Sequence, residues 1–176
     1  PQEGKMNLQE ALNIALDYER KVRDHYVNGM KAIDDPQGKK VFKTLAREEQ
    51  GHVDHLTRCL KQWTEKGIVD PESLTPVVQP GLAWIEKAKD ELKTKHETRE
   101  ASANEIELLK VALELEMTTS AFYRDLIGKL PEQDQSLFAD FLEIEEGHVA
   151  IVQAELDAVQ GNGFWFDLME FSLEAG

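Results

Sequence analysis

Four stretches of the chain repeat apolar residues at spacings of three and four, which is the pattern of one buried helix face. Signals that end helices close each stretch: the turn-like DDPQG, then Gly67, then Pro131, then GNG. Few prolines or glycines interrupt them, which favours helix over strand. We therefore expect an all-α protein with long helices over about 7–33, 39–66, 103–130 and 132–159.

The links between these helices predict how they are arranged. Both outer links are short, which is typical of antiparallel hairpins. The middle link, residues 67–102, contains three prolines in IVDPESLTPVVQPG and then a shorter helical segment, LAWIEKAKDELKTKHE. A long middle link lets the second hairpin cross over, so we expect a ferritin-like four-helix bundle over 1–160. Residues 161–176 would form an apolar tail that covers the bundle end or a neighbouring subunit, with partner docking as the alternative.

Ionisable residues interrupt the apolar stripes at six positions. Four of these positions form a Glu-x-x-His pattern that occurs twice, in REEQGHV and in IEEGHVA. The two halves of the chain also align, so that each hairpin carries one further glutamate on its first helix. A duplicated helical hairpin explains this pattern, and the six residues are Glu19, Glu49, His52, Glu116, Glu145 and His148.

Four carboxylates on buried stripes require neutralisation, because burying unpaired charge costs several kcal/mol. No Lys or Arg lies on the same stripes. Two divalent cations would balance four carboxylates, and two neutral imidazoles would complete their ligands. Such ligands suit iron, our preferred metal, or manganese, and zinc also fits. Tyr26 and Tyr123 lie two turns beyond a glutamate on the same stripes, so their hydroxyls are expected to hydrogen-bond the ligand carboxylates.

The composition of the chain limits the kinds of partner and the cellular compartment that we expect for the protein. A formal net charge of -14 without a concentrated basic stripe argues against nucleic acid. No window approaches the roughly 18 apolar residues of a membrane span. Cys59 is the one cysteine, so there is no intrachain disulfide and no CxxC pair. The opening PQEGK lacks the apolar run of a signal peptide, and we expect a cytoplasmic protein.

The combined motif, a glutamate on each first helix and Glu-x-x-His on each second helix, resembles the rubrerythrin branch of the ferritin-like superfamily. The resemblance covers about 7–159. It implies that Glu49 and Glu145 bridge two iron ions and that the other four ligands divide between them as Glu19 with His52 and Glu116 with His148. The implied activity is reduction of hydrogen peroxide, or reaction with dioxygen, in a homo-oligomer, with a dimer expected.

Two departures from the family pattern change this expectation. A typical rubrerythrin ends in a rubredoxin-like site with paired CxxC motifs, which this chain lacks, so a separate electron donor such as rubredoxin is expected. Thr119 stands where a typical rubrerythrin has a further ligand glutamate, which weakens the case for a peroxidase that relies on ligand switching. A ferroxidase linked to iron storage and a redox-silent metal-binding dimer are the alternatives. Solvated or packing roles are expected for His25, His55 and His96, and Cys59 is expected in the core.

Overall fold

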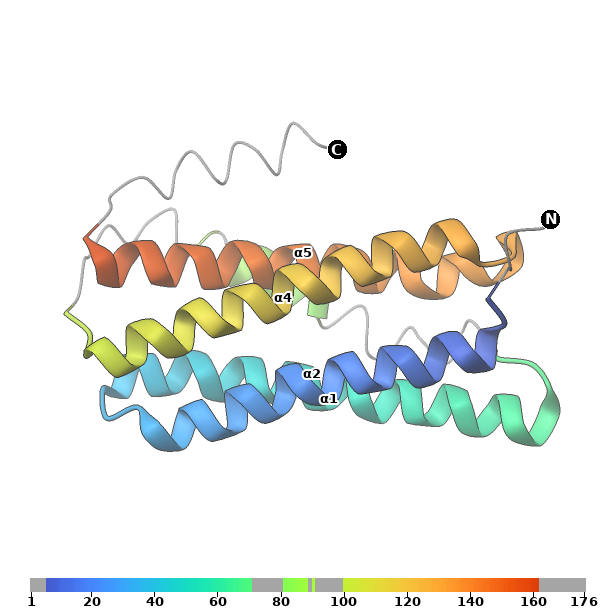
Figure 1. Cartoon of the computed structure of the whole chain (residues 1–176), viewed down its shortest axis with the longest axis horizontal. Helices are drawn as coiled ribbons and strands as arrows, with labels where there is room; N and C mark the ends of the chain where they lie inside the picture. Colours follow the sequence, from blue (N-terminus) through green and yellow to red (C-terminus); the bar gives the residue numbers. More distant parts are fainter. Residues whose placement is uncertain (1–5, 71–80, 89, 91–99, 162–176) are drawn as a thin grey trace.

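A computed structural model describes residues 6–70, 81–88, 90 and 100–161, and this part of the chain contains helices and no strand. The four long helices lie side by side (Figure 1), and residues 81–88 are also helical. The predicted all-α class is therefore confirmed. Most of the proline-rich link, His96 and the tail at 162–176 lie outside the described residues, so the division into a bundle and a tail stays a prediction. The long helices are α1 Leu8–Ala32, α2 Pro36–Lys66, α4 Ala103–Lys129 and α5 Glu132–Gln160.

Helix α2 begins three residues before the predicted start because the turn signal DDPQG also contains a helix cap. The Asp35 side chain accepts hydrogen bonds from the amides of Gln37 and Gly38. Pro36 then occupies the first turn, where a missing N–H costs nothing and the fixed φ suits a helix. At the other end Gly67 takes the left-handed conformation, with φ of 68°, and closes the helix as predicted.

The helices form two antiparallel hairpins, α1–α2 and α4–α5, and α1 packs against α4 to join them. In Figure 1, α2 ends at the right of the bundle and α4 begins at its left. The connection between them must therefore run the length of the molecule. This confirms the predicted ferritin-like four-helix bundle with one long crossover.

The core consists of two apolar clusters. One cluster surrounds the beginning of α1 and the end of α4, with Leu12 and Phe138 among its fully buried members. The other surrounds the end of α1 and the beginning of α4, with Phe42 and Leu109. The predicted ionisable residues fall between the two clusters along each helix. The bundle therefore encloses a polar layer with apolar packing on both sides.

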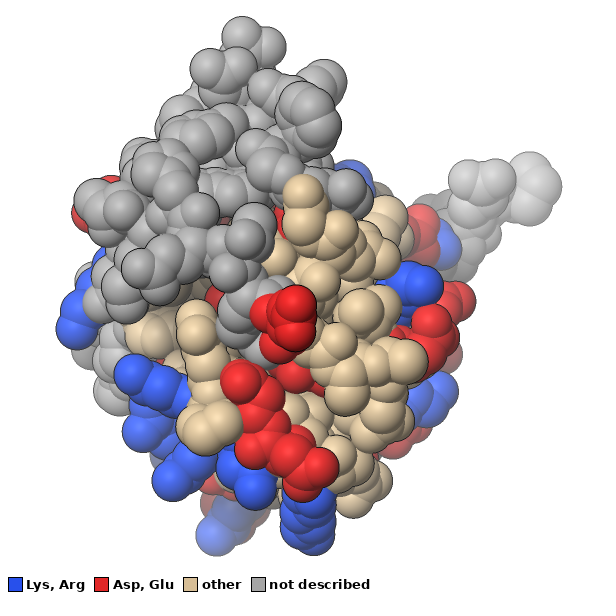
Figure 2. All heavy atoms as spheres, turned by 90° about the vertical axis from the view of Figure 1, so that its left-hand side faces the viewer, with Lys and Arg blue, Asp and Glu red and all other residues tan. Residues whose placement is uncertain are grey.

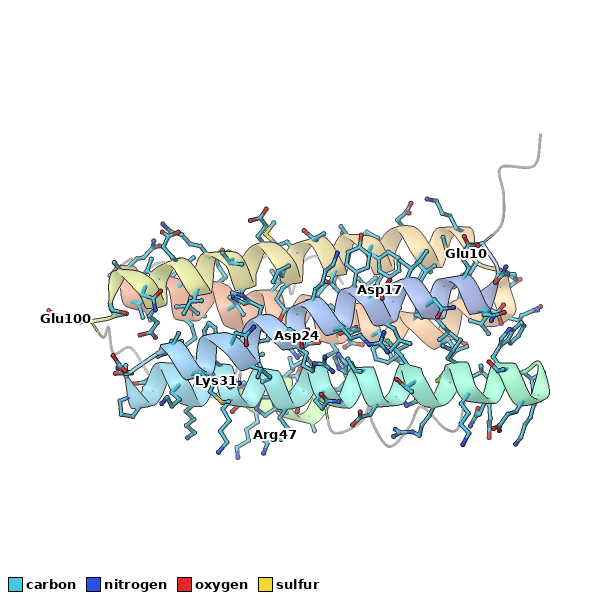
Figure 3. The ribbon with its side chains drawn as sticks, turned by 60° about the horizontal axis from the view of Figure 1, so that its bottom comes forward. Glu10, Asp17, Asp24, Lys31, Arg47 and Glu100 are labelled. Carbon is cyan, nitrogen blue, oxygen red and sulfur yellow. The ribbon has the colours of Figure 1, made fainter. Side chains whose placement is uncertain are left out.

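The remaining charges lie on the outside of the bundle. Figure 3 shows Glu10, Asp17 and Asp24 spaced along the outer side of α1, all exposed. The end view in Figure 2 shows Lys and Arg gathered on the side of α1 and α2, whereas α5 contains no Lys or Arg at all. In the part of the chain that the structure describes, no helix is both long and apolar enough to cross a membrane.

The glycines of the two repeated motifs have different surroundings. A Cβ on Gly147 would lie 2.6 and 2.7 Å from side-chain atoms of Ile85, which belongs to the helical segment 81–88. A Cβ on Gly51 would meet nothing within 4 Å. Gly147 therefore provides the space in which the crossover segment packs against α5.

This difference predicts opposite effects of the same substitution. Gly147→Ala should lower the free energy of unfolding by about 1–3 kcal/mol, because Ile85 must move. Gly51→Ala should raise it by up to about 1 kcal/mol, because alanine favours the helix and meets no neighbour. Urea unfolding of the two variants measures both, and equal effects would contradict the packing of residues 81–88 on α5.

Candidate metal centre

The six residues predicted from the repeated motifs meet in the polar layer at the middle of the bundle. Each of the four helices contributes to the cluster, and α2 and α5 each contribute a glutamate and a histidine on successive turns of the same face. All six side chains are at most 1% exposed: Glu19, Glu49, His52, Glu116, Glu145 and His148. The structure thus brings together every ligand candidate that the sequence indicates.

His52 lies among three carboxylates. Its Nδ1 atom is 3.4 Å from Glu19 Oε2, 3.3 Å from Glu49 Oε2 and 3.3 Å from Glu145 Oε1. These oxygens come from three different helices and surround one ring nitrogen. The four side chains form the first group of candidate ligands.

His148 has an equivalent position in the second hairpin. Its Nδ1 atom is 2.8 Å from Glu49 Oε1, 3.7 Å from Glu116 Oε2 and 3.9 Å from Glu145 Oε1. Glu49 therefore turns one carboxylate oxygen toward each histidine, and Glu145 also lies near both. These two glutamates occupy the position that bridging ligands would take between two metals.

The spacing and the unsatisfied atoms of the cluster fit metal ions. In each group the four ligand atoms lie within 4.8 Å of one another. Ligands about 2.1 Å from a common ion would lie within about 4.2 Å of each other, so little contraction is needed. Seven buried polar atoms find no hydrogen-bond partner among the described residues, and all belong to Glu49, Glu116, Glu145 and His148. Unsatisfied carboxylate and imidazole atoms that face one another are the donors that a divalent cation would use.

The pKa values of the clustered residues show that the cluster holds protons when no cation is bound. Burial, together with Glu19 and Glu116, raises the pKa of Glu49 to about 7. Burial and the other carboxylates also raise the pKa of Glu145 well above its usual value. Burial opposes protonation of His52 and His148, but the nearby carboxylates raise both pKa values well above the usual range. The metal-free cluster therefore takes up protons in place of metal charge, and metal binding must release them.

Glu19 is the exception in this cluster. Burial alone would raise the pKa of Glu19, but the charge and hydrogen bond of His52 outweigh it and lower the pKa to about 2. Tyr123 also donates a hydrogen bond to Glu19. Glu19 thus stays ionised over the whole neutral range.

The two tyrosines connect the hairpins. Tyr26 on α1 donates its hydroxyl to Glu116 Oε1 on α4 at 2.5 Å, and Tyr123 on α4 donates to Glu19 Oε1 on α1 at 2.5 Å. Burial and the neighbouring carboxylates raise the pKa of both phenols well above the usual value, so both hydroxyls keep their protons. The predicted hydrogen bonds are present, and each tyrosine reaches the glutamate of the opposite hairpin because α1 and α4 run antiparallel.

Removing either phenol hydroxyl should destabilise the bundle. Tyr26→Phe or Tyr123→Phe leaves a buried carboxylate oxygen without its donor, at a cost of about 1–3 kcal/mol in the free energy of unfolding. Tyr18→Phe is the matched control, because the Tyr18 hydroxyl has no hydrogen-bond partner in the part of the chain described. Urea unfolding of the three variants makes the comparison, and three equal values would contradict the role of these bonds.

The contacts of three further residues around the cluster could not be predicted in full. Thr119 is buried and donates its hydroxyl to the Leu115 carbonyl of its own helix at 2.9 Å, so it supplies no charged ligand. Trp84, from the helical segment 81–88, lies edge-on to His148 with ring centroids 5.9 Å apart. His55 is fully buried, with Nε2 3.2 Å from Cys59 Sγ, and burial followed by Arg58 lowers its pKa to about 4. A neutral packing role for His55 agrees with expectation, and Cys59 is buried as predicted.

Comparison with known proteins gives one match. A family model described as Rubrerythrin matches residues 10–156, a range that contains most of the four long helices and all six clustered residues. No curated protein and no solved structure gave a significant match.

Proposed function

The chain belongs to the rubrerythrin family, and on this premise we propose that it is a non-haem di-iron oxidoreductase that reduces hydrogen peroxide or reacts with dioxygen. The observation that carries the proposal is the pair of buried four-residue groups that share Glu49 and Glu145. Glu19 and His52 would hold one iron, and Glu116 and His148 the other. The iron pair would supply the redox chemistry, and manganese or zinc would fit the same ligands.

The residues around the cluster support this chemistry in definite ways. Tyr26 and Tyr123 hold Glu116 and Glu19 in fixed orientations and keep their protons while doing so. The apolar clusters on both sides exclude water and strengthen the electrostatic interactions inside. Trp84 covers one side of His148. The chain thus holds the ligand side chains in fixed orientations inside an apolar shell, and both features would tune a bound metal.

Reduction of peroxide to two waters consumes two electrons and two protons. The sequence holds one cysteine, and the Cys59 thiol is buried with a pKa raised by burial to about 11, so it is a poor thiolate reductant. We therefore assign the electrons to a separate donor protein such as rubredoxin. A single reduced cysteine suits the cytoplasm, where we place the protein.

Oxidation of ferrous iron linked to storage is the second candidate. Thr119 favours it, because its hydroxyl is bonded within its own helix and no extra carboxylate stands there for the ligand switching on which a peroxidase of the family pattern would rely. Both reactions use the same six ligands. They differ in the oxidant that reacts faster and in the need for an electron donor.

The test is stopped-flow oxidation of the anaerobic, iron-loaded protein by peroxide and, separately, by dioxygen. Faster oxidation by peroxide, with steady turnover only when reduced rubredoxin is added, is the expected result. Faster reaction with dioxygen together with net oxidation of added ferrous iron would favour the ferroxidase. Comparable slowness toward both oxidants at full iron loading would contradict both and leave the redox-silent metal-binding protein.

A further inference from the structure

The outer side of the α1–α2 hairpin carries a cluster of basic side chains near the turn that joins the two helices. One member lies in the last turn of α1, and the others lie on the first half of α2. Figure 3 shows Lys31 at the end of α1 and Arg47 on the neighbouring stretch of α2. All members of this cluster, which we call the basic face, are exposed: Lys31, Lys39, Lys40, Lys43 and Arg47.

The basic face differs in sign from the rest of the chain. Residues 20–47 contain eight Lys and Arg and three Asp, a net charge of +5, whereas the whole chain carries -14. All other residues together therefore carry -19. The sequence shows no concentrated basic stripe, because the five basic residues are spread over 31–47. The structure corrects that expectation, since the packing of α1 against α2 brings them together.

None of the five basic side chains has an ion-pair partner among the described residues. On α4, by contrast, Lys110, Arg124 and Lys129 each pair with a carboxylate at 3.1 Å or less. Carboxylates are not scarce, because the chain contains 34 acidic residues and 20 basic ones. The basic face is thus left without internal neutralisation.

This arrangement opposes the stability of α2. Lys39, Lys43 and Arg47 follow one another at spacings of four, so that like charges are neighbours on one side of the helix, which is destabilising. Lys39 also lies near the N-terminus of α2, where the helix dipole disfavours positive charge. The first turn contains no acidic residue to offset it. An external anionic surface would relieve both effects.

The basic face lies close to the candidate metal centre. Arg47 precedes Glu49 by two residues, on the opposite side of α2. On the same outer seam, Arg23 Nη1 of α1 donates a hydrogen bond to Gln50 Oε1 of α2 at 3.2 Å. A helix with its side chains is about 10–12 Å across. A protein docked on the outside of α2 would therefore lie about one helix diameter from the clustered glutamates and histidines.

The size and charge of the basic face select the kind of partner. From Lys39 to Arg47 it extends for about 12 Å along α2. A nucleic-acid duplex or a bilayer would extend beyond it and meet the negative remainder of the chain. The large apolar side chains exposed in the described part of the chain lie elsewhere, at Ile68, Val111 and Met117, so the face lacks apolar anchors for a membrane. A small acidic protein would contact the basic face alone.

We propose that the basic face docks an acidic protein and that this protein is the electron donor. Reduction of one peroxide takes two electrons, so a one-electron donor must bind and leave twice in each turnover. A small contact held by opposite charges suits this exchange, as in weak electron-transfer complexes. The role of the partner as donor rests on the proposed function, whereas the docking surface follows from the charges of α1 and α2.

Calorimetric titration of the iron-loaded chain with an acidic rubredoxin tests the docking surface. Lys43→Glu and Arg47→Glu should each weaken binding about threefold to tenfold, and added salt should weaken binding of the wild type. Both variants should melt no lower than the wild type, because repulsion on α2 becomes attraction. Lys61→Glu is the matched control on the same helix. It lies about 27 Å from Lys43, beyond the Debye length of about 10 Å at 0.1 M salt, and should leave the dissociation constant unchanged.

Oxidation of the pre-reduced protein separates failure of the docking surface from failure of the proposed function. A single oxidation by peroxide needs no donor, so Lys43→Glu should react at the wild-type rate, while turnover sustained by rubredoxin slows. Slow reaction of the wild type with both peroxide and dioxygen would contradict the proposed function, and calorimetry would still judge the surface. The docking surface is overturned if rubredoxin does not bind or if all three variants bind it equally. Tighter binding to phosphatidylserine vesicles or duplex DNA than to rubredoxin would also overturn it.

Discussion

Replacing Glu49 or Glu145 with alanine should abolish the metal pair. Each of these glutamates belongs to both candidate ligand groups, so its loss removes a ligand from two metals at once. Glu19→Ala or Glu116→Ala removes a ligand from one group only. Metal analysis after anaerobic loading with iron should therefore show two ions in the wild type, a reduced content in the Glu19 and Glu116 variants, and neither ion held in the Glu49 and Glu145 variants.

The neighbouring residues supply matched controls for this experiment. Glu48 and Glu146 carry the same side chain one position away, on a different face of the same helices. Glu146 lies on the surface, where it pairs with Arg124 at 2.6 Å. Glu48→Ala and Glu146→Ala should keep both ions, and an equal loss of metal in the variants and the controls would contradict the assignment of the ligands.

Removing the metals should reverse the pH dependence of stability. In the metal-free chain the pKa of Glu49 rises from 4.5 to about 7 on folding, so its contribution to stability is lost as pH rises through that range. This one group costs about 3 kcal/mol above pH 7. The pKa values of Glu145, His52 and His148 are also raised on folding, so these residues add to the loss of stability at higher pH.

The lowered pKa of Glu19 acts in the opposite sense. Its contribution is present above about pH 4.5 and is lost as pH falls toward 2. The metal-free protein should therefore be most stable in mild acid and lose stability toward pH 8. The metal-loaded protein should lose stability toward acid, because protons then compete with the metals for the same ligands.

Melting temperatures of chelated and iron-loaded protein between pH 5 and 8 measure how the stability of each form depends on pH. Glu49→Gln in the chelated protein should flatten the decline, because the amide cannot ionise. Parallel curves with and without metal, or an unchanged melting temperature after complete chelation, would show that the cluster does not bind metal in the core.

Helical periodicity predicts much of the fold and all six clustered residues, for a physical reason. A charged residue that falls on an apolar stripe must be buried if the helix packs at all, so Glu19 and Glu116 are recognisable without any motif. Pro36 shows the limit of such local signals. The same residue indicates a turn and can also begin a helix, and the side chain of Asp35 decides between them.

Contacts between distant segments could not be predicted in this way. Which glutamate each tyrosine reaches depends on the antiparallel packing of α1 and α4. Trp84 and Ile85 come from the crossover, whose sequence has no periodic relation to α5. Glu105 is another example: it is buried beside Gly38 of α2, although its position in the first turn of α4 suggests an exposed residue.

The edge-on contact between Trp84 and His148 has an optical consequence. An indole ring this close to a bound iron ion loses its fluorescence, whereas zinc, with its filled d shell, leaves the emission intact. His52 has Phe141 in the corresponding position, with ring centroids 5.2 Å apart, and phenylalanine contributes no comparable signal. The emission of Trp84, isolated by replacing Trp63 and Trp165 with phenylalanine, therefore reports the position next to His148 during titration, and it distinguishes iron from zinc.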